Sequence, residues 1–147
     1  MSRKQATLIH IAVGMVIVPL MWVIAYMIWP SPPPIQWEHG EFIPSTVVAG
    51  QEVLVAREFT VTQDVLITID RQFIQRRGNE TVVVEVSDIR QQYMPGVYKQ
   101  LRPFVIPCAL TPGLWELENT LTYRDLMGRD RTLHPPVIEL NVIGGCQ

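Results

Sequence analysis

The residues that could perform chemistry are few and widely spaced in this sequence. Nucleophilic catalysis needs a serine, threonine or cysteine within hydrogen-bond reach of a base, usually a histidine. After the apolar start of the chain, the histidines are His39, in a proline-rich segment, and His134, which precedes two prolines. Neither position favours a pocket shared with a nucleophile. We therefore predict no catalytic residue, and a protein that is not an enzyme.

Acidic and metal-binding residue types lead to the same result. Glu116 and Glu118 have the spacing of the solvated face of a strand, and the sequence has no His-x-His or Cys-x-x-Cys pattern. We predict no metal and no cofactor. The 12 basic and 14 acidic residues are intermixed and the net charge is −2, so we also predict no binding to nucleic acid.

The start of the chain has the composition of a membrane anchor. Residues 7–29 include no Asp, Glu, Lys or Arg, and as a helix they would exceed the ~30 Å of a bilayer core. We predict a cytoplasmic tail at 1–6 and a transmembrane helix at 7–29, with Trp22, Tyr26 and Trp29 at the membrane interface. A cleaved signal peptide is the alternative, but it would have a shorter apolar region followed by small residues.

The charges that flank this segment predict its direction. Arg3 and Lys4 precede it, whereas prolines and a serine follow it, so the positive-inside rule places the amino terminus in the cytoplasm. The rest of the chain is then periplasmic or extracellular, attached to the inner or plasma membrane by a single span.

Residues 30–44 are predicted to form an extended linker. Proline occupies positions 30, 32, 33, 34 and 44, and proline favours a polyproline-like spacer over a helix. Trp37 and Phe42 interrupt the segment. They either pack on the following domain or on headgroups, or they form a docking motif.

Residues 45–147 are predicted to form one all-β domain. Apolar and polar residues alternate in short runs that end in Gly, Pro, Asp or Asn, as in half-buried antiparallel strands. For example, Val65, Ile67, Ile69 and Phe73 share one face. Seven strands are predicted, at 46–48, 52–61, 65–74, 81–86, 101–106, 114–123 and 137–143.

One motif gives the domain a family resemblance. The run from Leu110 to Leu117 contains the turn Pro112-Gly113 and then Trp115, and alternation continues to Tyr123. It resembles the turn and sixth strand of immunoglobulin-like and fibronectin-III-like sandwiches, although tyrosine is commoner at the position of Trp115 and a Cys-Trp-Cys pattern is absent. The resemblance implies a seven-stranded antiparallel sandwich in which this ring fills the gap between the sheets. In layout the chain also resembles small membrane-anchored proteins of bacteria and bacteriophages.

The sandwich topology brings the two cysteines together. Cys108 follows the fifth predicted strand and Cys146 the seventh, and these strands run in the same direction. We predict a disulfide, which an oxidising compartment would preserve. Two free thiols, or half of a metal site, are the alternatives.

Two segments are candidate interaction surfaces. The loop 124–131 carries Leu126, Met127, Arg129 and Arg131, and is predicted at the membrane-facing end of the domain. It could contact lipid headgroups or a partner subunit, or it could be a solvated loop with Leu126 and Met127 as a plug. The second segment, 88–99, is predicted to be an irregular crossing with Tyr93, Met94 and Tyr98, which either bind or pack over a sheet edge.

These features favour a non-enzymatic interaction module with two kinds of partner, the lipid bilayer and another envelope or membrane protein. Its role would be that of an accessory subunit or a phage-encoded modulator at the cell envelope. The alternative is a membrane-tethered metal or redox chaperone for a respiratory complex, using Cys108, Cys146, His134 and Met127.

Overall fold

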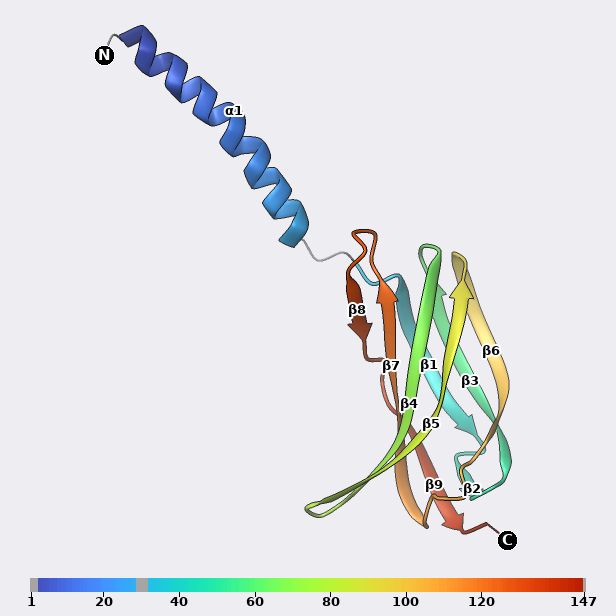
Figure 1. Ribbon diagram of the computed structural model, residues 1–147. Helices are drawn as coiled ribbons and strands as arrows, with labels where there is room; N and C mark the ends of the chain where they lie inside the picture. Colours follow the sequence, from blue (N-terminus) through green and yellow to red (C-terminus); the bar gives the residue numbers. More distant parts are fainter. Residues whose placement is uncertain (1–2, 29–31, 147) are drawn as a thin grey trace. The chain divides into compact units, whose positions relative to one another are not determined.

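The chain divides into two compact units, Met1–Pro32 and Pro33–Gln147. The structure, a computed structural model, describes residues 3–28 and 32–146, with side chains at 13–28 and 32–146. The first unit holds one helix, α1 (Arg3–Ile28) (Figure 1). The predicted span at 7–29 overlaps α1 and lies in part outside the described residues. Among residues described with side chains, no helix is both long and apolar enough to cross a bilayer.

The second unit consists of strands and connecting loops. Its described residues form nine strands: β1 (Ile35–Ile43), β2 (Thr46–Val48), β3 (Glu52–Val61), β4 (Val65–Arg77), β5 (Glu80–Tyr93), β6 (Gly96–Val105), β7 (Gly113–Arg124), β8 (Asp130–Leu133) and β9 (Ile138–Gly144). The prediction of an all-β domain is confirmed.

The strands form two sheets that pack as a sandwich (Figure 1). Sheet A has the order β1-β3-β6, and sheet B has the order β2-β9-β7-β4-β5, with β8 paired to the end of β7. β6 is an edge strand of sheet A and β5 an edge strand of sheet B. In the short turn that joins β5 to β6, the chain crosses from sheet B to sheet A.

The predicted strand number and the strictly antiparallel order are wrong. The described residues form nine strands rather than seven, and β2 pairs with β9 in parallel. The chain leaves β1 in sheet A at Pro44 and enters sheet B at once, where Asn141 donates its backbone N–H to the carbonyl of Ser45 (2.8 Å). This abrupt change of sheet sets β2 beside β9 in the same direction.

The predicted linker is also wrong from residue 35 onward. β1 pairs with β3 along its length, from Ile35 opposite Val61 to Ile43 opposite Leu54. The prolines at 32–34 and at 44 lie outside this strand, so they delimit it and do not remove donors from the ladder. Phe42 is buried and Trp37 stacks on Phe59, with ring centroids 5.5 Å apart. The packing interpretation of these two rings is therefore confirmed.

The core lies between the two sheets and contains two apolar clusters. One includes Phe42 and Val55 of sheet A with Phe73 and Trp115 of sheet B. The other includes Phe59 and Val61 of sheet A with Val65, Ile67, Ile69 and Leu121 of sheet B. The predicted shared face of β4 is confirmed, because Val65, Ile67, Ile69 and Phe73 are all buried.

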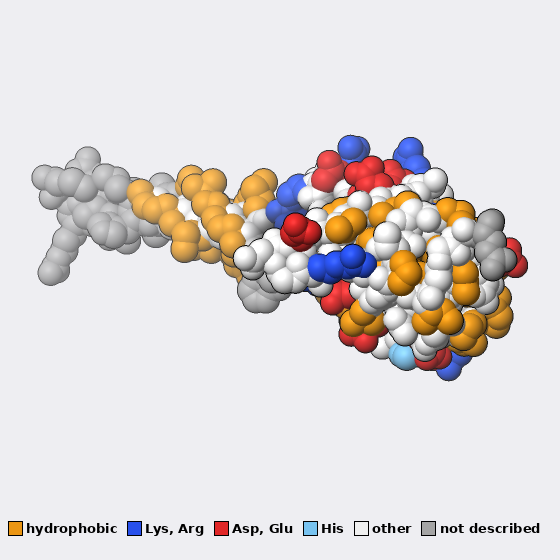
Figure 2. Space-filling model, turned by 90° about the horizontal axis from the view of Figure 1, so that it is seen from below, with side chains coloured by type: hydrophobic (Ala, Val, Ile, Leu, Met, Phe, Trp, Pro, Cys, Tyr) orange, Lys and Arg blue, Asp and Glu red, His pale blue; other side chains and the backbone are white. Residues whose placement is uncertain are grey.

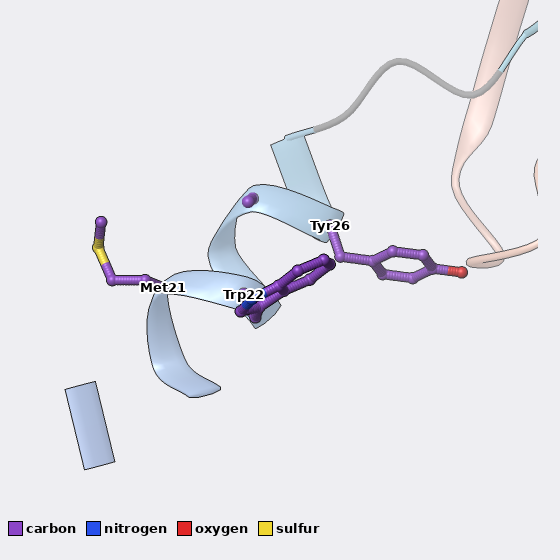
Figure 3. A pocket seen from close by; sticks show the side chains of 4 residues that line it. Met21, Trp22 and Tyr26 are labelled. Carbon is purple, nitrogen blue, oxygen red and sulfur yellow. The ribbon is translucent and has the colours of Figure 1, made fainter. Parts of the chain in front are cut away.

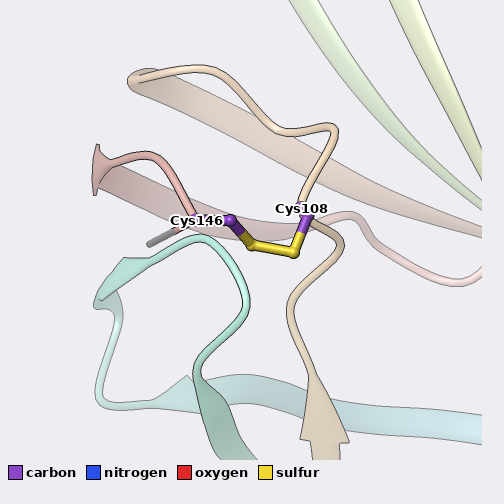
Figure 4. The surroundings of a disulfide bond; sticks show 2 residues. All are labelled: Cys108 and Cys146. Carbon is purple, nitrogen blue, oxygen red and sulfur yellow. A yellow bond between two sulfur atoms is a disulfide. The ribbon is translucent and has the colours of Figure 1, made fainter.

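A disulfide between Cys108 and Cys146 closes the end of the sandwich where β6 and β9 finish (Figure 4). The Cα atoms are 5.3 Å apart, and the predicted pairing is confirmed. Gly50 lies against the bridge with φ of +84°, and a Cβ there would approach Sγ of Cys146 to 2.6 Å. A glycine is thus required at this position. We call this end the far pole.

Candidate interaction surface

The opposite end of the sandwich, which we call the entry pole, gathers loops from both sheets. β1 begins there, with Ile35 opposite Val61, and the turns 62–64 and 94–95 and the loop 125–129 lie at the same end, as the register shows. Thr62 ties two of these segments together through its N–H bond to the carbonyl of Pro34 (2.9 Å). The loop 124–131 thus lies at the end where the chain enters the domain, as predicted (Figure 1).

The loop between β7 and β8 is organised around Asp125, whose side chain is buried. Its Oδ1 accepts the backbone N–H groups of Met127 and Arg129, both at 2.9 Å. Its Oδ2 accepts Nε of Arg129 (2.9 Å) and Nε of Arg131 (3.0 Å). One carboxylate therefore fixes the backbone and both predicted arginines. Asp125 itself was not among the predicted site residues, although Asp three residues before Gly128 is a common turn signal.

This arrangement changes the pKa of two groups. Burial acts to raise the pKa of Asp125, but the hydrogen bonds from Arg129, Arg131 and Met127 outweigh it and lower the pKa to about 2. The pKa of Tyr123 is raised, first by burial and also by Asp125, against the opposing effect of Arg131. The carboxylate of Asp125 is therefore charged at any physiological pH, and its hydrogen bonds to the loop are retained.

The side chains of Leu126 and Met127 point away from Asp125 and its hydrogen-bond partners. Leu126 is 81% exposed and Met127 42%, so they do not form a plug beneath the loop. Met94 and Val97, in and after the turn between β5 and β6, are each 66% exposed at the same pole. The entry pole thus presents apolar side chains from two ordered segments.

The predicted irregular crossing at 88–99 is instead the end of β5, a two-residue turn and the start of β6. Tyr93 is buried, and its ring meets those of Phe59 and Tyr98 edge-on at 5.3 Å. The hydroxyl of Tyr98 donates to the carbonyl of Met94 (2.8 Å) and secures the turn. Of the three predicted residues only Met94 is largely free to make contacts, while the two tyrosines support it.

On α1, the described side chains are exposed and apolar. Trp22 and Tyr26, four residues apart, project to the same side of the helix and line an apolar hollow together with Met21 and Ala25 (Figure 3). Trp29, the third predicted interfacial residue, lies outside the described residues.

The residues of the metal or redox interpretation do not come together. Cys108 and Cys146 are bonded to each other at the far pole, whereas Met127 lies at the entry pole, at the other end of β7. His134 lies near the hydroxyl of Thr120, at 3.5 Å. Within 32–146 and the described part of α1, no three His, Cys, Asp or Glu side chains are grouped to hold a metal ion.

Acidic and basic groups are intermixed on the surface of the domain, and Figure 2 shows both signs on one face. Pairs such as Arg76 with Glu116 and Glu118, and Lys99 with Glu58, account for part of this mixture. Glu116 and Glu118 thus form ion pairs on the outer face of β7, and that face is the one that their spacing predicted.

Sequence inspection missed a set of polar residues on the inner faces of the sheets. Arg57, Arg71 and Asn119 occupy inward positions of β3, β4 and β7. The alternation of the sequence indicated these inward positions, because each residue lies two positions from buried apolar residues on the same face. Arg71 lies between Ile69 and Phe73, and Asn119 between Leu117 and Leu121. Polar residues at predicted core positions indicate either strain or a site.

Comparison with known proteins gives structural likeness only. No protein family model matches the chain, and no curated protein matches its sequence. Among solved structures, the sporulation control protein Spo0M from Bacillus subtilis aligns with a TM-score of 0.45 and 12% identity, over 79% of this chain and 51% of Spo0M. The chain thus spans about half the length of that protein.

Two further structures are similar in the same way. The ApaA protein from Bordetella pertussis aligns with a TM-score of 0.44 and 17% identity, over 77% of this chain and 98% of ApaA. A Niemann-Pick type C2 protein from the Japanese carpenter ant aligns with a TM-score of 0.34 and 14% identity, over 72% of this chain and 96% of that protein. At these values the likeness does not bear on function.

Replacing Asp125 by asparagine is expected to loosen the loop between β7 and β8. An amide presents N–H groups to arginines that also donate, so at least one arginine contact is lost. Hydrogen exchange at Met127 and Arg129 should become about tenfold faster or more. Asp130→Asn, which alters an exposed ion pair with Arg124, is the matched control and should change these rates little. Equal effects of the two substitutions would contradict this description of the loop.

The same contact has a defined dependence on pH. Because the pKa of Asp125 is lowered from 3.8 to about 2 by folding, its contribution is fully present above pH 3.8 and is lost as the pH falls toward 2. Exchange at Met127 in the wild type should therefore approach that of the Asp125→Asn variant only in this acidic range.

Proposed function

We propose that the chain is a non-enzymatic, membrane-anchored interaction protein whose entry pole binds another envelope or membrane protein. The observation that carries the proposal is the exposure of Leu126, Met127, Met94 and Val97 on segments held by Asp125 and Tyr98. Exposed apolar side chains on a fixed backbone lose little conformational freedom on binding. Methionine also adapts to the shape of a partner surface.

The anchor in this proposal is the predicted transmembrane helix at 7–29, with the bilayer as the second partner. It is supported by the absence of charged residues in this segment and by the exposed apolar side chains described on α1. Arg3 and Lys4 before the segment favour a cytoplasmic amino terminus and an exported domain. The disulfide supports the same direction, because such bonds persist in oxidising compartments.

The chain connection explains why the entry pole would be the surface that is used. Only residues 29–32 separate the end of α1 from the second unit. At about 3.5 Å per residue, the seven steps from Ile28 to Ile35 would hold the start of β1 within about 25 Å of the end of an anchored helix. A membrane protein in the same bilayer would therefore meet the entry pole first, as expected for an accessory subunit or a phage-encoded modulator of the envelope.

Photo-crosslinking in the native host tests this proposal. A photoreactive amino acid at position 126 is expected to capture a discrete membrane or envelope protein. The matched control is position 143, since Ile143 is also a large apolar residue, 62% exposed, but lies at the far pole. Capture of the same protein from both positions, or from 143 alone, would contradict the use of the entry pole.

A further inference from the structure

The interior of the sandwich contains cationic and amide groups between its two apolar clusters. Arg57 follows Val53 and Val55 and precedes Phe59 and Val61 on the inner face of β3. Arg71 and Asn119 occupy the equivalent places on β4 and β7 and lie directly opposite each other in the sheet register. We call Arg57, Arg71, Asn119 and the nearby Arg102 the polar belt.

Two members of the polar belt have polar atoms without partners. Asn119 is only 3% exposed, and neither its side-chain oxygen nor its nitrogen makes a hydrogen bond. The Nε of Arg57 is also buried without a hydrogen bond. Buried polar atoms are nearly always paired in folded proteins, because leaving them unpaired is costly. These unpaired atoms therefore indicate a bound group that would form hydrogen bonds with them.

The positive charge of the belt is not balanced by salt bridges to the described residues. Burial, and next the positive charge of Arg71, lower the pKa of Arg57. Tyr93 acts to raise this pKa, and Arg102 acts to lower it. Among the described residues, no carboxylate forms a salt bridge with any of these three arginines. The one acidic side chain that raises the pKa of Arg71 is Asp88. An additional negative charge would stabilise this cluster.

Arg71 is held in place without being neutralised. Its Nε donates to the carbonyl of Ser87 (3.1 Å), which lies where the register between β4 and β5 shifts. Its guanidinium carbon lies 5.5 Å from the centre of the Phe104 ring on β6. The group is therefore oriented between the edges of the two sheets.

The belt is open to solvent along one side. β5 and β6 each pair with a single neighbour, and the inward side chains of Val86 and Gln100 are only half-buried. Arg102 lies on the same face of β6 as Tyr98 and Phe104, yet it is exposed. A ligand could therefore approach the belt between these two edge strands, where Arg57 and Arg71 are themselves only half-buried.

We propose that the polar belt binds a phosphate group that enters between β5 and β6, either as free phosphate or as the headgroup of an anionic phospholipid. Arginine forms paired, charge-assisted hydrogen bonds with phosphate oxygens, and three arginines from three strands could surround one such group. The Nδ2 of Asn119 would supply a further donor. This site is independent of the entry pole and of the interaction proposed there.

Calorimetry on the full chain in uncharged detergent tests the proposal. The probes are inorganic phosphate, with chloride at equal ionic strength as the reference, and dihexanoyl phosphatidylglycerol, with the zwitterionic phosphatidylcholine as its reference. Binding of inorganic phosphate would identify free phosphate as the ligand, and binding of phosphatidylglycerol would identify a lipid headgroup. In either case Arg57→Met is expected to weaken the binding about tenfold or more. Arg90→Met removes the same charge from the exposed outer position of β5 and should leave the affinity unchanged.

A second measurement shows that a loss of binding is not a loss of folding. Because Arg57 is a partly buried cation that forms no salt bridge with a described residue, Arg57→Met should not lower the melting temperature of the unliganded protein. Asn119→Leu should behave likewise and should also weaken the binding. The proposal is overturned if neither probe binds the wild type, or if the affinity is the same in Arg57→Met as in the wild type.

Discussion

Replacing Trp115 by alanine is expected to lower the free energy of unfolding by about 3 to 5 kcal/mol, which is a large part of the stability of a domain of this size. The indole is fully buried between the sheets and joins residues from both in one cluster. Its Nε1 also donates to the carbonyl of Thr111 (2.7 Å), at the turn before β7. Alanine leaves a cavity in the core and removes this donor.

Trp115→Phe separates these two contributions. A phenyl ring retains much of the apolar contact but leaves the carbonyl of Thr111 without its donor, so the loss should be about 1 to 2 kcal/mol. Urea unfolding of the full chain in detergent, followed by circular dichroism, measures both variants. A loss below about 1 kcal/mol for Trp115→Ala would mean that this ring does not support the sandwich.

Removing the disulfide is expected to have an effect of similar size. With Cys108 and Cys146 separated by 38 positions, the bridge should stabilise the domain by about 4 kcal/mol on the chain-entropy model. For a domain of this size, the variant with both cysteines changed to serine should melt roughly 15 °C lower. Thermal unfolding with and without reductant measures this effect.

Reductant provides the internal control for the bridge. It should lower the melting temperature of the wild type to that of the double serine variant, and it should not change the variant. If reductant alters both proteins equally, or neither, the stabilisation does not come from the disulfide.

Alternation and turn chemistry were sufficient to predict the main elements of the domain. The inner faces of β4 and β7 follow the period of two, because one face of each is buried against the other sheet. The pairing of the cysteines, 38 positions apart, follows from the order of the strands in a sandwich. The alternation and the Pro112-Gly113 turn before Trp115 are local features. These features depend on short stretches of sequence, so they were accessible without a structure.

The errors arose where a local signal had two interpretations. Prolines at 32–34 and 44 indicate a spacer, but they equally mark the ends of an intervening strand, and only pairing with β3 distinguishes the two. The alternation along β5 is interrupted between Val86 and Ile89, where the register with β4 shifts, so the sequence shows no continuous period of two there. The parallel pairing of β2 depends on which sheet the chain enters, and a strand of three residues carries no signal for that.

The candidate sites were predictable only in part. Leu126, Met127, Arg129 and Arg131 were identified from a mixed loop, and they do share one ordered structure. The role of Asp125 as its centre depends on tertiary burial, which sequence does not reveal. Tyr93 and Tyr98 were predicted either to bind a partner or to pack over a sheet edge, and their ring contacts with Phe59 show the packing alternative.

Protease access in intact spheroplasts tests most directly the claim that α1 anchors an exported domain. A recognition site for a sequence-specific protease can be inserted after Gly78, at the exposed tip of the hairpin between β4 and β5. If the domain lies outside the membrane, protease added to intact spheroplasts will cleave the chain, while a cytoplasmic protein carrying the same site stays whole. Cleavage only after detergent has opened the membrane would contradict the proposed orientation.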